Sequence, residues 1–439
     1  MDMTTIGLIA IISLFALMLV GIPIAFSLGI VSLVLIYFVW PGPSPFSMLY
    51  FTSWNLTHNF ILATVPLFIL LGEIILFSGL ASDVFDVASK WVGRLPGGLA
   101  VAGIFGCAGF AAVSGSSVAN TATNAMVAVP EMLKRGYSKK LAPGCIAAGG
   151  ALGILIPPSI PMILYATMAE ESIGQLFFGG MIPGIMTALI FAVYIVIRCS
   201  KDRSFGPPSE KSSWRDKFGS LWKMLPLLAL VAGVLGTVYL GVCTPSESAA
   251  VGALGALIIA FAYRKLNRRN LTGALLAAIK TNAMIIMIFI GGLLFSHVLS
   301  FMGLSKLVVN AVLELEVNRW VIMIGLNLLL LVLGCFIDPG SIIIIVTPLA
   351  LPVILNLGFD PIWFGIIFTI NMEMANITPP LGYNLYVLKG VVPAEVKLQD
   401  IILGMLPFLA LFALSLAIVM IFPQLALWLP NKMIKSRIK

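Results

Sequence analysis

Long apolar runs recur along the whole sequence, and each is about long enough to cross a lipid bilayer. Of the 439 residues, 60% are hydrophobic and only 10% are charged, and the mean hydropathy is +1.08. A soluble domain of this size needs far more charged residues on its surface, whereas apolar runs of about 20 residues are typical of transmembrane helices. The chain is therefore predicted to be an all-α, polytopic membrane protein.

The net charge of +8 would suit nucleic acid, but the basic residues lie in loops between the apolar runs. Such a distribution is typical of membrane topology signals, so no nucleic-acid partner is expected. The five cysteines show no paired spacing and the two histidines lie far apart, which argues against a disulfide framework or a metal cluster. The sequence contains no GxxxxGK[ST] motif and no nucleophile–base pair, so neither an ATP-driven pump nor a membrane enzyme is supported.

One polar stretch, Val113–Asn124, lies at membrane depth between two apolar runs. Unpaired backbone in hydrocarbon is costly, so such a stretch must be buried in protein or line a cavity. Its serine and asparagine oxygens could coordinate a small cation or cap exposed helix ends. Close packing of small residues between helices is the alternative. A second polar interruption, Asp338–Ser341, recurs in the other half of the chain and favours a site.

Proline breaks and basic flanks divide the chain into ten predicted spans and two re-entrant hairpins, with the N-terminus outside. The hairpins are 97–130 and 320–355, since each is apolar with a polar middle. Segments 80–96 and 304–317 are amphipathic and are predicted to lie along the membrane surface. A Pro-Pro pair interrupts the span after each hairpin, and proline breaks a helix interior. The predicted spans are 5–40 (two spans), 61–79, 141–168, 175–198, 225–242, 249–263, 281–300, 361–389 and 401–428.

Two halves of the chain carry the same motifs in the same order, about 221 to 224 residues apart. The matched motifs are FxGL at 77–80 and 301–304, SGSS at 114–117 and DPGS at 338–341, IPP at 156–158 and TPP at 378–380, and LY at 164–165 and 385–386. Five spans in each half give the halves opposite orientations. Inverted repeats with interrupted helices in corresponding positions are typical of alternating-access carriers, whose site lies at the repeat interface.

The broken helices predict the chemistry of that site. Helices unwound at 154–159 and 376–382 leave carbonyls and amides without partners. Half-helix N-termini attract anions, whereas carbonyl ends attract cations. Each break, together with a hairpin tip, could therefore form an oxygen cage for Na⁺. No Lys or Arg lies at membrane depth in this core, so an anionic substrate would be held by amides, hydroxyls and bound cations.

Asp338 is the strongest candidate for cation coupling, because it supplies a formal negative charge at the tip of the second hairpin. The alternative is that it only caps a helix beginning at Pro339. Asn376 and Thr378 are further cage candidates. Glu373 is a weaker candidate, which could instead pair with a nearby polar group.

The sequence resembles the large membrane subunit (DctM type) of tripartite ATP-independent periplasmic (TRAP) transporters over essentially its whole length. The motifs that carry the resemblance are TVPLFILLGEI, GFAAVSGSSVANTA, GALGILIPPSIPMILYA, CFIDPGS and MANITPPLGYNLYV. The resemblance implies a multi-pass protein of the bacterial inner membrane that imports an organic acid, such as a C4-dicarboxylate or sialic acid, with two or more Na⁺ ions. It also implies an elevator motion, similar to that of the ion-transporter superfamily, in which a transport domain slides past a scaffold.

Two protein partners follow from the same resemblance: a small membrane subunit (DctQ type), expected as a separate chain, and a periplasmic substrate-binding protein (DctP type). The family pattern places Ser114, Ser116 and Asp338 near substrate and sodium. The full set of expected substrate-binding residues is Ser114, Gly115, Ser116, Ser117, Asn120, Pro157, Pro158, Pro379 and Pro380. The expected Na⁺ ligands are Ser114, Ser116, Asp338, Gly340, Ser341, Asn376 and Thr378.

The predicted organisation alternates scaffold and transport segments. Scaffold helices and the first amphipathic arm occupy 1–96, the first transport half 97–175, further scaffold helices and the second arm 176–318, the second transport half 319–398, and the last helix with a basic tail 399–439. Two other functions stay open at this point. A stand-alone Na⁺/dicarboxylate symporter would share the repeat, and an anion channel would also use discontinuous helices.

Overall fold

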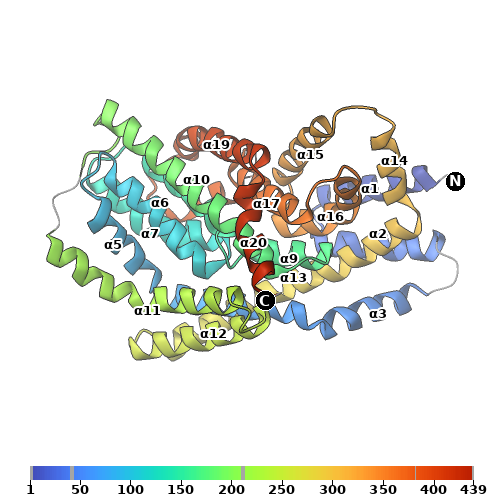
Figure 1. Cartoon of the computed structure of the whole chain (residues 1–439), viewed down its shortest axis with the longest axis horizontal. Coiled ribbons are helices and arrows are strands. Elements are labelled where there is room, and N and C mark those ends of the chain that lie inside the picture. Colours follow the sequence, from blue (N-terminus) through green and yellow to red (C-terminus); the bar gives the residue numbers. More distant parts are fainter. Residues whose placement is uncertain (1–2, 40–43, 209–212, 381, 438–439) are drawn as a thin grey trace.

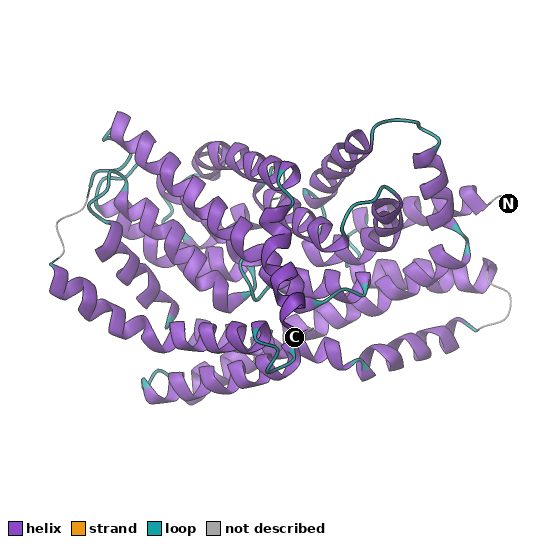
Figure 2. Ribbon diagram, viewed as in Figure 1, coloured by secondary structure: helices purple, strands orange, loops and turns teal. Residues whose placement is uncertain are grey.

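The computed structural model describes residues 3–39, 44–208, 213–380 and 382–437. Within these ranges the secondary structure consists of helices and loops without strands (Figure 2), which confirms the predicted all-α class. Six of the described helices are long and apolar enough to cross a membrane, or seven if the two bent parts of α11 (Trp214–Tyr239) form one span. The chain is therefore a polytopic membrane protein. The number of ten spans stays a prediction, because some of the predicted spans correspond to helices shorter than those six.

The first four α-helices follow the predicted breaks. A turn at Gly21, whose φ of +93° suits glycine, separates the first two helices before Pro23. The third helix occupies the mixed, aromatic segment before the next predicted span. These elements are α1 (Met3–Leu19), α2 (Ile24–Val39), α3 (Pro45–His58), the 3₁₀ turn η1 (Phe60–Ala63) and α4 (Thr64–Phe77).

Both amphipathic segments form short helices, α5 (Ala81–Val92) and α14 (Leu304–Leu313). Each follows a glycine with positive φ, +68° at Gly79 and +69° at Gly303. In α5 the apolar side chains Val84, Phe85 and Val87 are buried, whereas Asp86 is exposed. The helices end several residues before the predicted limits of 96 and 317.

The first predicted hairpin consists of two helices separated by Gly115 and Ser116, and the following span is interrupted at Pro157-Pro158, which is a cis pair. The elements are α6 (Gly98–Ser114), α7 (Ser117–Lys134), α8 (Leu141–Ala151), the 3₁₀ turn η2 (Leu152–Ile154), α9 (Ile160–Ala169) and α10 (Ile173–Lys201).

The second half of the chain begins with α12 (Pro245–Ala262) and α13 (Arg268–Phe301). After α14 it contains α15 (Arg319–Gly334), α16 (Pro339–Asn356), α17 (Pro361–Ile377), α18 (Tyr383–Val391), α19 (Leu398–Ile421) and α20 (Gln424–Arg437). Pro379-Pro380, between α17 and α18, is also a cis pair.

Three predicted boundaries are wrong. The span at 281–300 begins earlier, at Arg268, because Asn267 caps the helix by accepting from the Asn270 backbone N–H. The segment between the predicted spans 175–198 and 225–242 is shorter than expected, since α10 continues to Lys201 and α11 begins at Trp214. The last span, 401–428, is not one helix. It divides into α19 and α20 around Pro423, which has no backbone N–H to continue the helix.

Helix α17 lies at the centre of the molecule together with α9. In Figure 1 the two lie between a group containing α6, α7 and α10 on the left and a group containing α15 and α16 on the right. Every residue of α17 from Ile362 to Ile377 is buried, including the polar residues Asn371, Glu373 and Asn376. The Tyr165 hydroxyl of α9 donates to the Pro361 carbonyl at 2.8 Å and joins the two central helices.

Candidate functional site

The tip of the first hairpin is a tight turn with exposed backbone groups. Gly115 adopts a left-handed conformation with φ +60°, which ends α6. The Ser116 hydroxyl then caps α7 by accepting from the Ala119 N–H at 3.4 Å. The Ser114 hydroxyl donates to the Ser116 carbonyl at 3.5 Å. The predicted residues Ser114, Gly115, Ser116 and Ser117 thus lie together at one turn.

This hairpin tip packs directly on the first broken helix. The Ile160 N–H donates to the Gly115 carbonyl at 3.4 Å. A Cβ atom on Gly115 would approach the Pro158 carbonyl to 2.9 Å, and one on Gly153 would approach the Ser116 carbonyl to 2.8 Å. Neither position has room for a side chain. The structure therefore places the predicted residues Pro157 and Pro158, both buried, beside the first hairpin tip.

The second broken helix meets the same tip through Asn376. Its amide nitrogen donates to the Ser117 hydroxyl at 3.1 Å, a contact between residues 259 positions apart in the chain. Only 3% of Asn376 and 4% of Ser117 are exposed. The Thr378 hydroxyl, close after Asn376, donates to the Met374 carbonyl at 2.6 Å. The turn at Ser114–Ser117 therefore lies against parts of both broken helices.

The second hairpin forms a group of its own. Asp338 caps α16, because it accepts from the Ser341 N–H at 3.0 Å and from the Ser341 hydroxyl at 2.5 Å. Gly340 lies against the Leu164 side chain of α9. Among the described residues, no hydrogen bond connects Asp338 with Asn376 or Thr378. Asp338 thus makes the contacts of a helix cap, which was the alternative to cation binding. Its binding of a cation stays a prediction.

The remaining predicted residues differ in their surroundings. Pro379 is half-buried and Pro380 is exposed, and the Pro380 carbonyl accepts from the Tyr386 hydroxyl at 3.1 Å. Asn120 is fully buried one turn beyond the first hairpin tip, and its amide donates to the Cys107 and Gly150 carbonyls at 3.0 and 3.2 Å. These bonds join α6, α7 and α8, so Asn120 has a clear packing role. Its contact with substrate stays a prediction.

Two helices of this region, α7 and α18, carry buried polar atoms without hydrogen-bond partners. The hydroxyls of Thr121 and Thr123 on α7 are buried and unpartnered, as is the whole amide of Asn384 on α18, which packs on α7. The described part of the chain contains no cluster of three His, Cys, Asp or Glu residues. Hydroxyl and carbonyl oxygens suit a hard cation such as Na⁺. The unpartnered buried oxygens of α7 and α18 fit that chemistry, and Asn384, at the start of α18, is not among the residues that the sequence predicts for the site.

Glu373 is the most unusual residue of the central helix. It is fully buried, and neither of its carboxyl oxygens has a hydrogen-bond partner. The Leu155 backbone lies near the carboxyl, at the first helix break, but without the geometry of a hydrogen bond. The suggested pairing with a polar neighbour is therefore not seen. Because a buried acid in a membrane protein is costly, its presence points to function.

Replacing Glu373 with leucine is expected to raise the temperature of unfolding and to lower uptake at least about tenfold. Removing an unpartnered buried polar group stabilises a fold by about 1–3 kcal/mol, whereas the carboxyl is lost to transport. Thermal unfolding and uptake by the same purified variant measure the two effects. Met374→Leu, a conservative change at the next buried position, serves as the control. Normal uptake by Glu373→Leu would show that the Glu373 carboxyl is not needed for transport.

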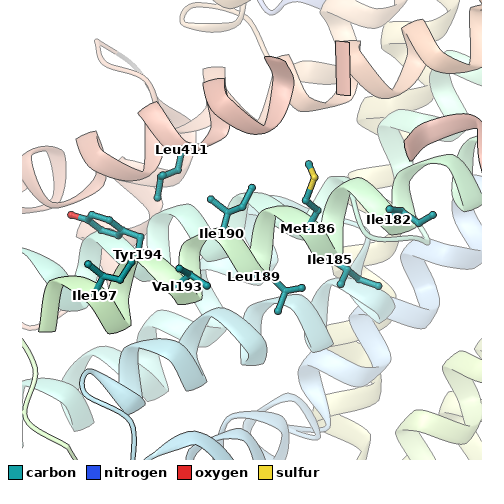
Figure 3. Close-up of a pocket in the computed structure, with 9 residues that line it drawn as sticks. All are labelled: Ile182, Ile185, Met186, Leu189, Ile190, Val193, Tyr194, Ile197 and Leu411. Atoms are coloured by element: carbon teal, nitrogen blue, oxygen red, sulfur yellow. The ribbon is translucent and has the colours of Figure 1, made fainter. Parts of the chain in front are cut away.

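An apolar groove lies away from this region. It has a volume of about 630 Å³ and runs along the outer side of α10 from Ile182 to Ile197, with Leu411 of α19 beside it (Figure 3). All nine lining residues are apolar or aromatic, and none is a predicted site residue. A surface of this kind on a membrane-spanning helix suits lipid chains, so the groove is not the candidate site.

Comparison with known proteins gives consistent matches over nearly the whole chain. Residues 11–425 match a family model described as the DctM component of tripartite ATP-independent periplasmic transporters. The C4-dicarboxylate TRAP transporter large permease protein DctM of Rhodobacter capsulatus is 35% identical over 437 residues, covering 95% of this chain and 97% of the relative. The sialic acid TRAP transporter large permease protein SiaM of Vibrio cholerae is 30% identical over 416 residues, covering 94% and 96%.

A solved structure shares the fold at low sequence identity. The YdaH transporter of Alcanivorax borkumensis, described as having an unusual topology, superposes with a TM-score of 0.62 at 14% identity, covering 93% of this chain and 98% of its own. At this identity the likeness concerns the fold alone. The named relatives are permease subunits of transporters and not enzymes.

Proposed function

The chain belongs to the DctM family of TRAP transporters, and from this premise we propose that it imports an organic acid together with Na⁺. Membership over residues 11–425 makes it a large permease subunit of the bacterial inner membrane. It is a transport protein and not an enzyme. The proposal concerns its substrate, its coupling ion, its motion and its partners.

The proposed substrate is a carboxylate. Two relatives are named for C4-dicarboxylates and for sialic acid, which share a carboxylate group. No basic side chain lies among the predicted substrate-binding residues. The negative charge would be met by backbone amides at the helix ends, by serine hydroxyls and by bound Na⁺. This arrangement links binding of the acid to binding of the cation.

The hydrogen bond between Ser117 and Asn376 is the main support for a site that both halves of the chain share. It joins the tip of one hairpin to the broken helix of the other half, where half-helix ends and buried hydroxyls meet. Ser114, Ser116, Asn376 and Thr378 are proposed to hold Na⁺ here. Asp338, Gly340 and Ser341 are proposed to hold a second Na⁺ at the other hairpin, where Asp338 supplies the charge.

We further propose that the halves are inverted repeats that move as an elevator. The order of α6 to α10 recurs in α15 to α19, and a cis Pro-Pro pair lies at the corresponding place in each. The second part of each broken helix packs on the other hairpin, α9 on α16 and α18 on α7. Segments 97–175 and 319–398 would then form one transport domain, and the remaining segments the scaffold.

Two partner proteins complete the proposed system. The family name denotes a tripartite, periplasmic transporter. The two further components are proposed to be a small membrane subunit of the DctQ type and a substrate-binding protein of the DctP type that delivers the acid. A stand-alone symporter of similar architecture is the main rival.

Reconstituted uptake separates these functions. Proteoliposomes containing the chain and its small subunit are supplied with radiolabelled succinate or sialic acid, and Na⁺ and the binding protein are each omitted in turn. Uptake is expected to fall to background in both omissions. Full uptake without the binding protein would identify a stand-alone symporter, and full uptake without Na⁺ would overturn the coupling.

A further inference from the structure

The first two turns of α11 have the composition of a membrane–water boundary. Residues 214–222 form a helical piece bent by 52° from the apolar piece that follows. Three aromatic side chains on this piece are exposed, Trp214 by 68%, Phe218 by 57% and Trp222 by 73%. Exposed aromatic rings beside basic residues are typical of the interface between headgroups and acyl chains. The basic residues Arg198, Lys201 and Arg203 lie shortly before this piece in the sequence.

Lys217 is the unusual residue of this piece. Only 8% of it is exposed, although it carries a charge. Its Nζ lies 4.9 Å from the centre of the Trp214 ring and 5.9 Å from that of the Trp91 ring of α5. Within the described ranges no carboxylate forms an ion pair with it, and the neighbouring Asp216 is bonded to the Ser213 N–H at 3.3 Å. A largely buried cation without a counter-charge favours an anion beside it.

An apolar groove begins at Trp91. It has a volume of about 320 Å³ and lies between the amphipathic helix α5, with Val84, Val87 and Trp91, and α11, with Leu221 and Met224. The two helices are also joined by an edge contact between the rings of Trp91 and Phe218, whose centres are 5.9 Å apart. From Val84 to Trp91 the groove follows only about two turns of α5. This length suits part of an acyl chain better than a partner helix.

We propose that this elbow between α5 and α11 binds an acidic phospholipid, with the headgroup phosphate at Lys217 and an acyl chain in the groove. Trp91 belongs to both parts, because its ring contacts the cation and lines the groove. The charge selects an anionic headgroup, and the exposed aromatic rings place that headgroup at bilayer level. A lipid is favoured over soluble phosphate because the groove is apolar.

Lipid titration followed by native mass spectrometry tests this site. The delipidated full chain is titrated with phosphatidylglycerol or with phosphatidylcholine of the same acyl chains. Wild type is expected to retain more phosphatidylglycerol, and Lys217→Gln is expected to reduce that retention about fivefold, to the phosphatidylcholine level. Lys217→Arg should retain the preference. Lys201→Gln, an exposed lysine at the end of α10, is the matched control and should behave as wild type.

Two further arms identify the occupant. Ala88→Phe, which places a ring in the groove, is expected to lower retention of both lipids. Sodium phosphate at millimolar concentration should not displace phosphatidylglycerol. Equal retention by Lys217→Gln and Lys201→Gln would overturn the proposal, as would displacement by phosphate, which indicates a soluble-anion site. Loss of small-subunit co-purification in Lys217→Gln with lipid retention unchanged would identify a protein interface instead.

Discussion

Asp338→Asn is expected to lower Na⁺-dependent uptake at least about 100-fold while the protein stays folded. Asparagine can still accept from the Ser341 N–H, so the cap of α16 is preserved. Only the formal charge is lost. A 100-fold loss corresponds to about 2.8 kcal/mol, which is the scale of a hydrogen bond or contact with a charged group. Uptake at a series of Na⁺ concentrations measures the effect.

Both capping contacts of Asp338 are known, so substitutions can separate its role as a helix cap from its role as a negative charge. Asp338→Ser keeps a good N-cap residue without charge and should match Asp338→Asn. Asp338→Ala removes both cap and charge and should also lower the temperature of unfolding. If Asp338→Asn and Asp338→Ser showed normal sodium dependence, Asp338 would be a helix cap alone and would leave the proposed site.

Asn376→Ala is expected to reduce uptake at least about tenfold and to weaken the apparent affinity for Na⁺. The substitution removes the bond to Ser117 and leaves a buried hydroxyl without its partner. A buried group left unsatisfied costs about 1–3 kcal/mol, here at the junction between a hairpin tip and a broken helix. Initial uptake rates at varied Na⁺ concentration measure the change.

A matched control for this substitution exists in the neighbouring helix pair. Asn327 of α15 is buried and accepts from the Asn371 amide of α17. Asn327→Ala should therefore destabilise the fold to a similar extent while the Na⁺ dependence stays normal. Equal loss of Na⁺ affinity in both variants would mean that Asn376 acts through stability and not through the site.

The positions of the helix breaks could be predicted from the sequence, because each break depends on a few neighbouring residues. Glycine and paired prolines interrupt apolar runs within a few residues, and Gly115 and Pro157-Pro158 lie where expected. The cap at Asp338 can be predicted for the same reason, since Asp followed by Pro is a local signal of a helix start. Pro423 is also a local signal, but its position near the end of an apolar run did not show that a separate helix, α20, begins after it.

Contacts between distant residues could not be predicted in this way. No periodicity connects Ser117 with Asn376, 259 residues further along the chain. The absence of a partner for Glu373 is likewise a property of the packing around α17, which brings apolar side chains from many helices against it. The burial of Lys217 could not be predicted either, because it depends on tryptophans from two helices.

Flux driven by a Na⁺ gradient alone is the sharpest test of Na⁺-coupled import by this chain. Proteoliposomes holding the chain and its small subunit, supplied with the binding protein, are prepared with equal succinate or sialic acid on both sides and with Na⁺ raised on the outside only. We expect net accumulation of the acid inside the vesicles, which disappears when Na⁺ is equal on both sides. No net movement of the acid under the Na⁺ gradient would contradict Na⁺ coupling.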